Sequence, residues 1–201
     1  MHRAPNARQR GVTMIEVMIA VLVLSIGLLG VAATLAKSAR FSMGAWAQSA
    51  VANGLSDIAE RMRSSPNAAV AAFGLTDTYN TQRGALDAGT VVAGKDCDST
   101  ACTPAESAQF HLANWRLGLN AGMPGAAGWV NPLSSATTEV KATSYEVVVM
   151  WFDKTNIGTD NALNPALVCT GTETGVDQRR CCPEPAKAPD GVRCTRMVLV
   201  P

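Results

Sequence analysis

The 201-residue sequence is poor in histidine, in charge and in catalytic motifs. His2 lies at the extreme N-terminus, so any site built on an imidazole would depend on His111 alone. Charged residues make up 16% of the chain, less than in an average protein. The sequence has no G-x-S-x-G, no P-loop and no glycine-rich dinucleotide motif. We therefore expect no enzymatic activity and no cofactor.

The charge balance also argues against a nucleic-acid partner. Lys and Arg number 17 against 16 Asp and Glu, for a net charge of +1. Nucleic-acid binding usually requires a basic patch or stripe, which this balance does not predict. Arg179-Arg180 together with Arg193 and Arg196 form only a small basic cluster in the sequence. We keep DNA capture as a minor alternative and regard nucleic acid as an unlikely partner.

One long apolar block, residues 12–36, follows a short basic segment. Within it, Val17–Ala36 is a run of 20 residues without a charge. At about 1.5 Å of rise per residue, such a helix is roughly 30 Å long and matches the hydrocarbon core of a bilayer. The arginines of residues 1–11 are expected to stay in the cytoplasm. The remainder of the chain would then lie in the periplasm, anchored by a single span of the inner membrane.

Glu16 interrupts the apolar block near its beginning. A carboxylate at membrane depth costs roughly 2.5–3.5 kcal/mol on insertion scales. Either Glu16 sits at headgroup level, or a partner group meets it. A second interpretation of the whole block is an ordinary signal peptide, with residues 17–30 as its apolar region and Val31-Ala32-Ala33 as its cleavage site. Glu16 and the continued helical pattern beyond Ala36 argue against that interpretation.

The segment Arg10-Gly11-Val12-Thr13-Met14-Ile15-Glu16 resembles the leader of type IV prepilins and type II secretion pseudopilins. The shared features are a basic leader ending in Gly, an apolar first residue and Glu at the fifth position. The resemblance implies that prepilin peptidase cleaves after Gly11 and methylates the new amine of Val12. It also implies that Glu16 neutralises the Val12 amine of a neighbouring subunit in a filament, a pairing that makes two buried charges tolerable. Val12 departs from the family, which usually has Phe there.

Beyond the apolar block, the pattern predicts a helix that continues to about Arg63. A stripe recurs at spacings of three or four, and Pro66 ends it. The members of the stripe are Phe41, Ala45, Gln48, Val51, Leu55, Ile58 and Met62. We therefore divide the chain into a leader (1–11), a membrane or filament-core helix (12–36), its amphipathic continuation (37–66) and a periplasmic head (67–201).

The head is expected to be mixed in structure. Residues 67–138 read as loops with short elements, apart from a helix over Ala105–Asn120 and a turn at Met123-Pro124-Gly125. Ser144–Asp153 and Arg193–Val200 are rich in β-branched and apolar residues and predict two strands. Thr138–Thr143 is a further candidate for pairing. The expected fold class is α+β and pilin-like, with a small antiparallel sheet packed on the long helix.

Six cysteines all follow the apolar block, and their even number predicts a disulfide framework in an oxidising compartment. Adjacent Cys181 and Cys182 are expected to have different partners. We expect Cys97–Cys102 to close a short loop, and Cys169 and Cys194 to take one each of the adjacent pair. A metal site is disfavoured, because the spacings contain no C-x-x-C pair and both histidines are distant in sequence.

Two segments beyond the apolar block refine the resemblance. Ala52–Pro66 is similar to the helix end, and Tyr145–Asp153 to the Tyr-x-Val-x-Val-x-Trp-x-Asp strand, of the PilV subgroup of minor pilins. This resemblance implies a structural subunit that helps initiate the type IV pilus, in twitching motility and adhesion. Its implied partners are prepilin peptidase, other minor pilins, the major pilin, the inner-membrane assembly platform and a tip adhesin. A type II secretion pseudopilin and a pilin-like DNA-uptake or ligand-binding module remain alternatives.

Overall fold

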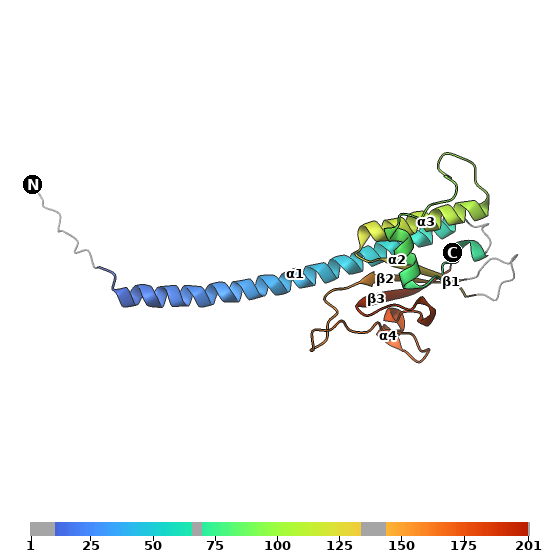
Figure 1. Ribbon diagram of the computed structural model, residues 1–201. Coiled ribbons are helices and arrows are strands. Elements are labelled where there is room, and N and C mark those ends of the chain that lie inside the picture. The colour runs from blue at the N-terminus through green and yellow to red at the C-terminus, as the bar shows by residue number, and fades with distance from the viewer. Residues whose placement is uncertain (1–10, 66–69, 134–143, 201) are drawn as a thin grey trace, which may run out of the picture. The chain divides into compact units, whose positions relative to one another are not determined.

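The computed structural model describes residues 11–65, 70–133 and 144–200 (Figure 1). The chain divides into two compact units, Met1–Ala45 and Trp46–Pro201. The first unit contains the beginning of α1 (Met14–Ser64), and the second contains the rest of that helix and the head. Thr138–Thr143, expected as a pairing segment, falls outside the described residues.

In its described residues, the head contains three further α-helices, two 3₁₀ turns and a sheet. In chain order these are η1 (Val70–Phe73), α2 (Tyr79–Asp87), α3 (Pro104–Gly122), β1 (Ala127–Pro132), β2 (Tyr145–Phe152), α4 (Gly175–Arg180), η2 (Glu184–Ala186) and β3 (Val192–Leu199). The predicted helix over Ala105–Asn120 and the two predicted strands are confirmed, each within two residues at its ends. The predicted α+β class with an antiparallel sheet is also confirmed.

The sheet has the order β1-β2-β3, and both pairings are antiparallel. In the register, Val148 lies opposite Trp129 on one side and Arg196 on the other. The central strand β2 is buried along nearly its whole length, which explains its continuous run of apolar residues. A strand buried on both faces requires a covering layer on each side, and the head supplies two different ones.

One face of the sheet packs against the helices. Ile58 and Met62 of α1, Trp115 of α3, and Val147 and Val149 of β2 belong to a single buried cluster. In Figure 1, α3 runs alongside the end of α1, and both cover the sheet. Burial of each large apolar side chain contributes about 1.5–3 kcal/mol relative to exposure. This cluster is therefore the main source of stability in the head.

The other face of the sheet is covered by the C-terminal segment. Val148 and Met150 alternate with the residues above and point to the second buried cluster. There they meet Trp129, Cys182 and Cys194. The disulfide between the two cysteines therefore lies inside this smaller core, where it supplements a segment with few apolar residues.

Trp115 is packed between two glycines. Its indole Nε1 donates a hydrogen bond of 2.7 Å to the carbonyl of Gly54 on α1. A Cβ atom added to Gly128 would lie 2.3 Å from Cζ3 of the indole, and one added to Gly54 would lie 2.5 Å from Cδ2 of Leu119. Both glycines are thus required by the close approach of α3 to its neighbours rather than by backbone conformation.

The predicted stripe on the long helix is correct only in its second half. Val51, Leu55, Ile58 and Met62 are buried, as expected. The first half of the stripe is wrong, because Phe41, Ala45 and Gln48 are exposed. Partial burial begins at Ala47, where the helical layer of the head begins.

Three elements within residues 67–138 were not predicted, namely η1, α2 and β1. α2 has a buried polar side chain, Gln82, and a side-chain cap from Thr78 to the backbone N–H of Thr81 at 3.3 Å. β1 contains Gly128 and ends in Pro132, residues that are rare in strands. The expected turn at Met123-Pro124-Gly125 is present, and Gly125 adopts a positive φ of 60°.

Candidate functional site

The start of α1 carries the residues of the leader motif. Gly11, Val12 and Thr13 precede the helix, which begins at Met14. The carbonyl of Thr13 accepts hydrogen bonds from the backbone N–H groups of Glu16 and Val17, at 3.1 and 3.3 Å. The peptide bond after Gly11 is therefore outside the helix.

Glu16 lies in the first turn of α1. The unpaired N–H groups of a helix N-terminus carry a partial positive charge, which favours a carboxylate at this position. The side chain is exposed, and within residues 11–65, 70–133 and 144–200 no basic side chain forms an ion pair with it. A full counter-charge for Glu16 in an apolar environment therefore has to come from elsewhere.

The surface of α1 that follows Glu16 is apolar on all sides. The large apolar side chains from Val17 to Leu35 are all at least 50% exposed. The hydroxyls of Ser25 and Thr34 donate to the carbonyls of Leu22 and Val31, each at 2.8 Å, so their polarity is satisfied inside the helix. By length and composition, α1 is able to span a membrane.

The helix runs without a break through Val31-Ala32-Ala33. These residues lie in regular α-helix that continues to Ser64, as the leader interpretation expects.

All six cysteines form disulfides in the structure. Cys97 is joined to Cys102, Cys169 to Cys181 and Cys182 to Cys194. The adjacent pair thus has two different partners, and of the two arrangements that the sequence allowed, the chain adopts the one with two successive loops of equal sequence separation, 12 residues.

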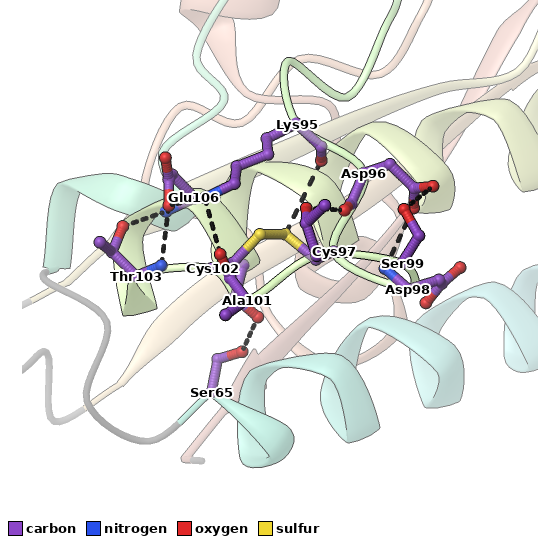
Figure 2. The surroundings of a disulfide bond; sticks show 12 residues. Ser65, Lys95, Asp96, Cys97, Asp98, Ser99, Ala101, Cys102, Thr103 and Glu106 are labelled. Carbon is purple, nitrogen blue, oxygen red and sulfur yellow. Dashed lines mark hydrogen bonds and ion pairs between the residues drawn. A yellow bond between two sulfur atoms is a disulfide. The ribbon is translucent and has the colours of Figure 1, made fainter.

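The Cys97–Cys102 bridge closes a loop directly before α3 (Figure 2). Thr103 caps that helix in a capping box, in which Glu106 accepts from the backbone N–H of Thr103 at 2.8 Å. The ammonium group of Lys95 lies 3.2 Å from the same carboxylate and 2.7 Å from the carbonyl of Ala101. These donors, first the Thr103 N–H and then Lys95, hold the pKa of Glu106 below its ordinary value.

The capping box was visible in the sequence as Thr103-Pro104-Ala105-Glu106, but it was not used in the prediction. Ser65, just after α1, adds a contact between its hydroxyl and that of Ser107 at 3.2 Å. The disulfide loop and the cap together fix the start of α3 beside the end of α1. We interpret this cluster as structural.

The remaining candidate groups do not come together as a site. Arg193 pairs with Asp153, and Arg196 pairs with Glu146, so two members of the basic cluster are neutralised. His111 lies on α3, where burial and then the charge of Arg61 lower its pKa. Within the part of the chain that the structure describes, no three His, Cys, Asp or Glu side chains are grouped so as to hold a metal ion.

A groove of about 400 Å³ runs between α1 and α3 in the head. Small residues make up much of its lining, including Gly54, Gly118 and Gly122, and Trp46 and Asp57 also line it. It contains a single carboxylate and no pair of groups suited to acid–base chemistry. We assign it no ligand.

Comparison with known proteins identifies only the N-terminal segment. Residues 6–32 match the family model described as the prokaryotic N-terminal methylation motif. No curated protein and no solved structure matches the chain. The matched segment contains Gly11, Val12 and Glu16, the residues that the leader motif singled out. It indicates a structural protein rather than an enzyme, and it supports a place for this chain in the superfamily of type IV pilins and pseudopilins.

Proposed function

We propose that the chain is a minor pilin of the PilV subgroup, a structural subunit that helps initiate assembly of a type IV pilus. The main observation in support is the methylation motif. It lies at the start of a helix whose first half is apolar on all sides and is not buried in a core. Such a helix requires lipid or other helices around it. The three disulfides of the head are typical of a domain exported to an oxidising compartment.

In the proposed pathway, the precursor is inserted in the inner membrane with residues 1–11 in the cytoplasm and the head in the periplasm. Prepilin peptidase cleaves after Gly11 and methylates the amine of Val12. The mature chain then enters the pilus near its tip, through contacts with other minor pilins, the major pilin, the assembly platform and an adhesin. The position of that bond outside α1 supports cleavage there.

The proposed role of Glu16 is to neutralise the Val12 amine of a neighbouring subunit. A buried amine and a buried carboxylate are each costly alone, and pairing offsets part of both costs. The first-turn position of Glu16 supports this role, because it places the carboxylate about one helical turn from the chain's own start. A subunit displaced by a small axial step brings a second N-terminus to the same level.

The test is the pair of variants Glu16→Val and Glu16→Gln, with Glu60→Gln as the matched control on the exposed end of α1. We expect both Glu16 variants to insert in the membrane normally and to be depleted from sheared pili. Normal incorporation of either variant would contradict the pairing. Glu60→Gln is expected to have no effect, since its partner Arg63 lies on the solvent side of the helix.

The mass of the mature protein tests the processing steps together. Cleavage after Gly11, one added methyl group and three disulfides are expected. A chain that keeps its arginine-rich leader, or that begins at Thr34, would contradict the proposal. A deletion strain separates the alternatives: loss of twitching is expected for a pilin, and loss of protein secretion for a pseudopilin.

A further inference from the structure

Ten residues of α1, residues 37–46, lie between the uncharged span and the buried core of the head, and the last of them, Trp46, also lines the groove of the head. We call this segment the collar. All of its described side chains are exposed, and partial burial of α1 begins only at the next residue, Ala47. Three of them are large and apolar: Phe41 is 79% exposed, Met43 56% and Trp46 53%.

These side chains do not form a stripe. Phe41 lies on nearly the same side of the helix as Lys37. Measured around the axis from Lys37, Trp46 lies at about 180° and Met43 at about 240°. A docked protein helix or head usually covers one stripe of a helix. Exposed apolar side chains on opposite sides of the helix are not covered by one such stripe, and the segment is directly continuous with the span that is able to cross a membrane.

The charges of the collar match a lipid surface. Lys37 and Arg40 follow the uncharged span, and the sequence contains no acidic residue between Glu16 and Asp57. The cations therefore have no carboxylate within one helical turn. Aromatic side chains and long basic side chains are the residues that proteins place at the level of lipid headgroups.

The position of the apolar span relative to the bilayer supports the same assignment. If residues 17–36 fill the hydrocarbon, Glu16 is at its inner boundary and Trp46 lies well outside the outer headgroups. Sliding the span by four residues, to 21–40, moves Glu16 about 6 Å into the cytoplasmic headgroup layer. Phe41 then lies at the outer hydrocarbon boundary and Trp46 about 7 Å beyond it, within the headgroup layer.

The cost of that shift is small, because a lysine side chain such as that of Lys37 is long enough to reach the phosphates from within the boundary. We propose that, in the membrane-bound form, the collar is the outer interfacial anchor of the chain. Phe41, Met43 and Trp46 lie among the lipid headgroups, and Glu16 stays out of the hydrocarbon until a filament partner meets it. This inference rests on the proposed membrane-anchored precursor.

The chain offers a built-in probe for the test. Of its four tryptophans, Trp115, Trp129 and Trp151 are at most 9% exposed, so Trp46 is the exposed indole. The full-length precursor is reconstituted in vesicles of phosphatidylethanolamine and phosphatidylglycerol and recovered by flotation. Its fluorescence is compared with that of Trp46→Phe, and the difference isolates Trp46.

With headgroup-labelled quencher lipid, we expect the Trp46 emission to be blue-shifted and to lose about half of its intensity. A second indole, introduced by Phe41→Trp in the Trp46→Phe background, is expected to be quenched more strongly by acyl-chain quenchers. If the protein floats but Trp46 is quenched only by aqueous acrylamide, the proposed position of the collar among the headgroups is wrong, whereas the proposed membrane anchor is retained. If the protein does not float, the membrane-anchored precursor itself is wrong, and the collar fails with it.

Discussion

The two units of the chain differ in whether their own structure buries their apolar side chains. In the first unit, the large apolar side chains from Val12 to Met43 are all at least half exposed. In the second, the helices and the C-terminal segment enclose both faces of β2. The head therefore carries its own stability, whereas the first unit depends on what surrounds it. The same substitution is expected to have different consequences in the two units, and the predictions below use that difference.

The largest contrast is expected between Ile58→Ala and Leu28→Ala. Ile58 is fully buried and Leu28 is 61% exposed, although both lie on α1. Removing the buried side chain is expected to destabilise the head by about 2–5 kcal/mol, from lost burial and the remaining cavity. Leu28→Ala should leave head stability unchanged. Denaturant unfolding of the full chain in detergent, followed by near-UV circular dichroism, measures both.

An equal loss from the two variants would contradict the comparison, because it would mean that the first unit contributes to the core of the head. The buried tryptophans make the near-UV signal specific for the head, since three of the four lie in its core.

A second contrast lies within the disulfide framework. Removing Cys182–Cys194 with a double Cys→Ser change is expected to cost about 2–4 kcal/mol, and the two serines would be left in the second core. The matched change at Cys97 and Cys102 should cost less, because that loop is shorter and largely exposed. Thermal unfolding of both variants shows which disulfide contributes more to stability. A larger loss at Cys97–Cys102 would show that the start of α3, not the C-terminal segment, controls stability.

Glycine substitutions sharpen the comparison further. Gly128→Ala places a methyl group against the Trp115 ring and is expected to cost about 1–3 kcal/mol from overpacking. Gly27→Ala is the control, since nothing lies within 4 Å of its added Cβ. It should leave the head unaffected and favour the helix by up to about 1 kcal/mol. A loss of head stability in Gly27→Ala, or none in Gly128→Ala, would contradict the packing described here.

Sequence patterns predicted the elements whose own residues favour them. Val147–Val149 and the capped segment that begins at Thr103 have strong local preferences, and both formed as strand and helix. β1 was not predicted, because Gly128 and Pro132 disfavour a strand. It forms because β2 offers a complete row of backbone partners. Phe41 illustrates the opposite error: helical spacing alone cannot show where the covering layer of the head begins.

The leader motif is visible in the sequence for a physical reason. Gly11, Val12 and Glu16 lie within six consecutive residues, so their spacing is local, and the roles proposed for them stay predictions. The cluster of Lys95, Thr103 and Glu106 joins a loop to a helix across a disulfide. Only the capping half of that cluster has a local signature, and the position of Lys95 depends on the fold.

The smallest expected effect is a pH dependence that belongs to the head alone. Burial alone would raise the pKa of Asp153, but hydrogen bonds from Thr155 and the charge of Arg193 outweigh it and lower the pKa below 3.8. A carboxyl group whose pKa is lower in the folded state stabilises the fold when ionised. That contribution is present above about pH 4 and is lost as the pH falls through the folded-state pKa. Asp153→Asn should therefore reduce the acid-induced decrease in head stability below about pH 4 and leave the helical signal of the first unit unchanged. A variant whose stability falls with acid as steeply as that of the natural chain would show that the contacts of Asp153 do not persist in solution.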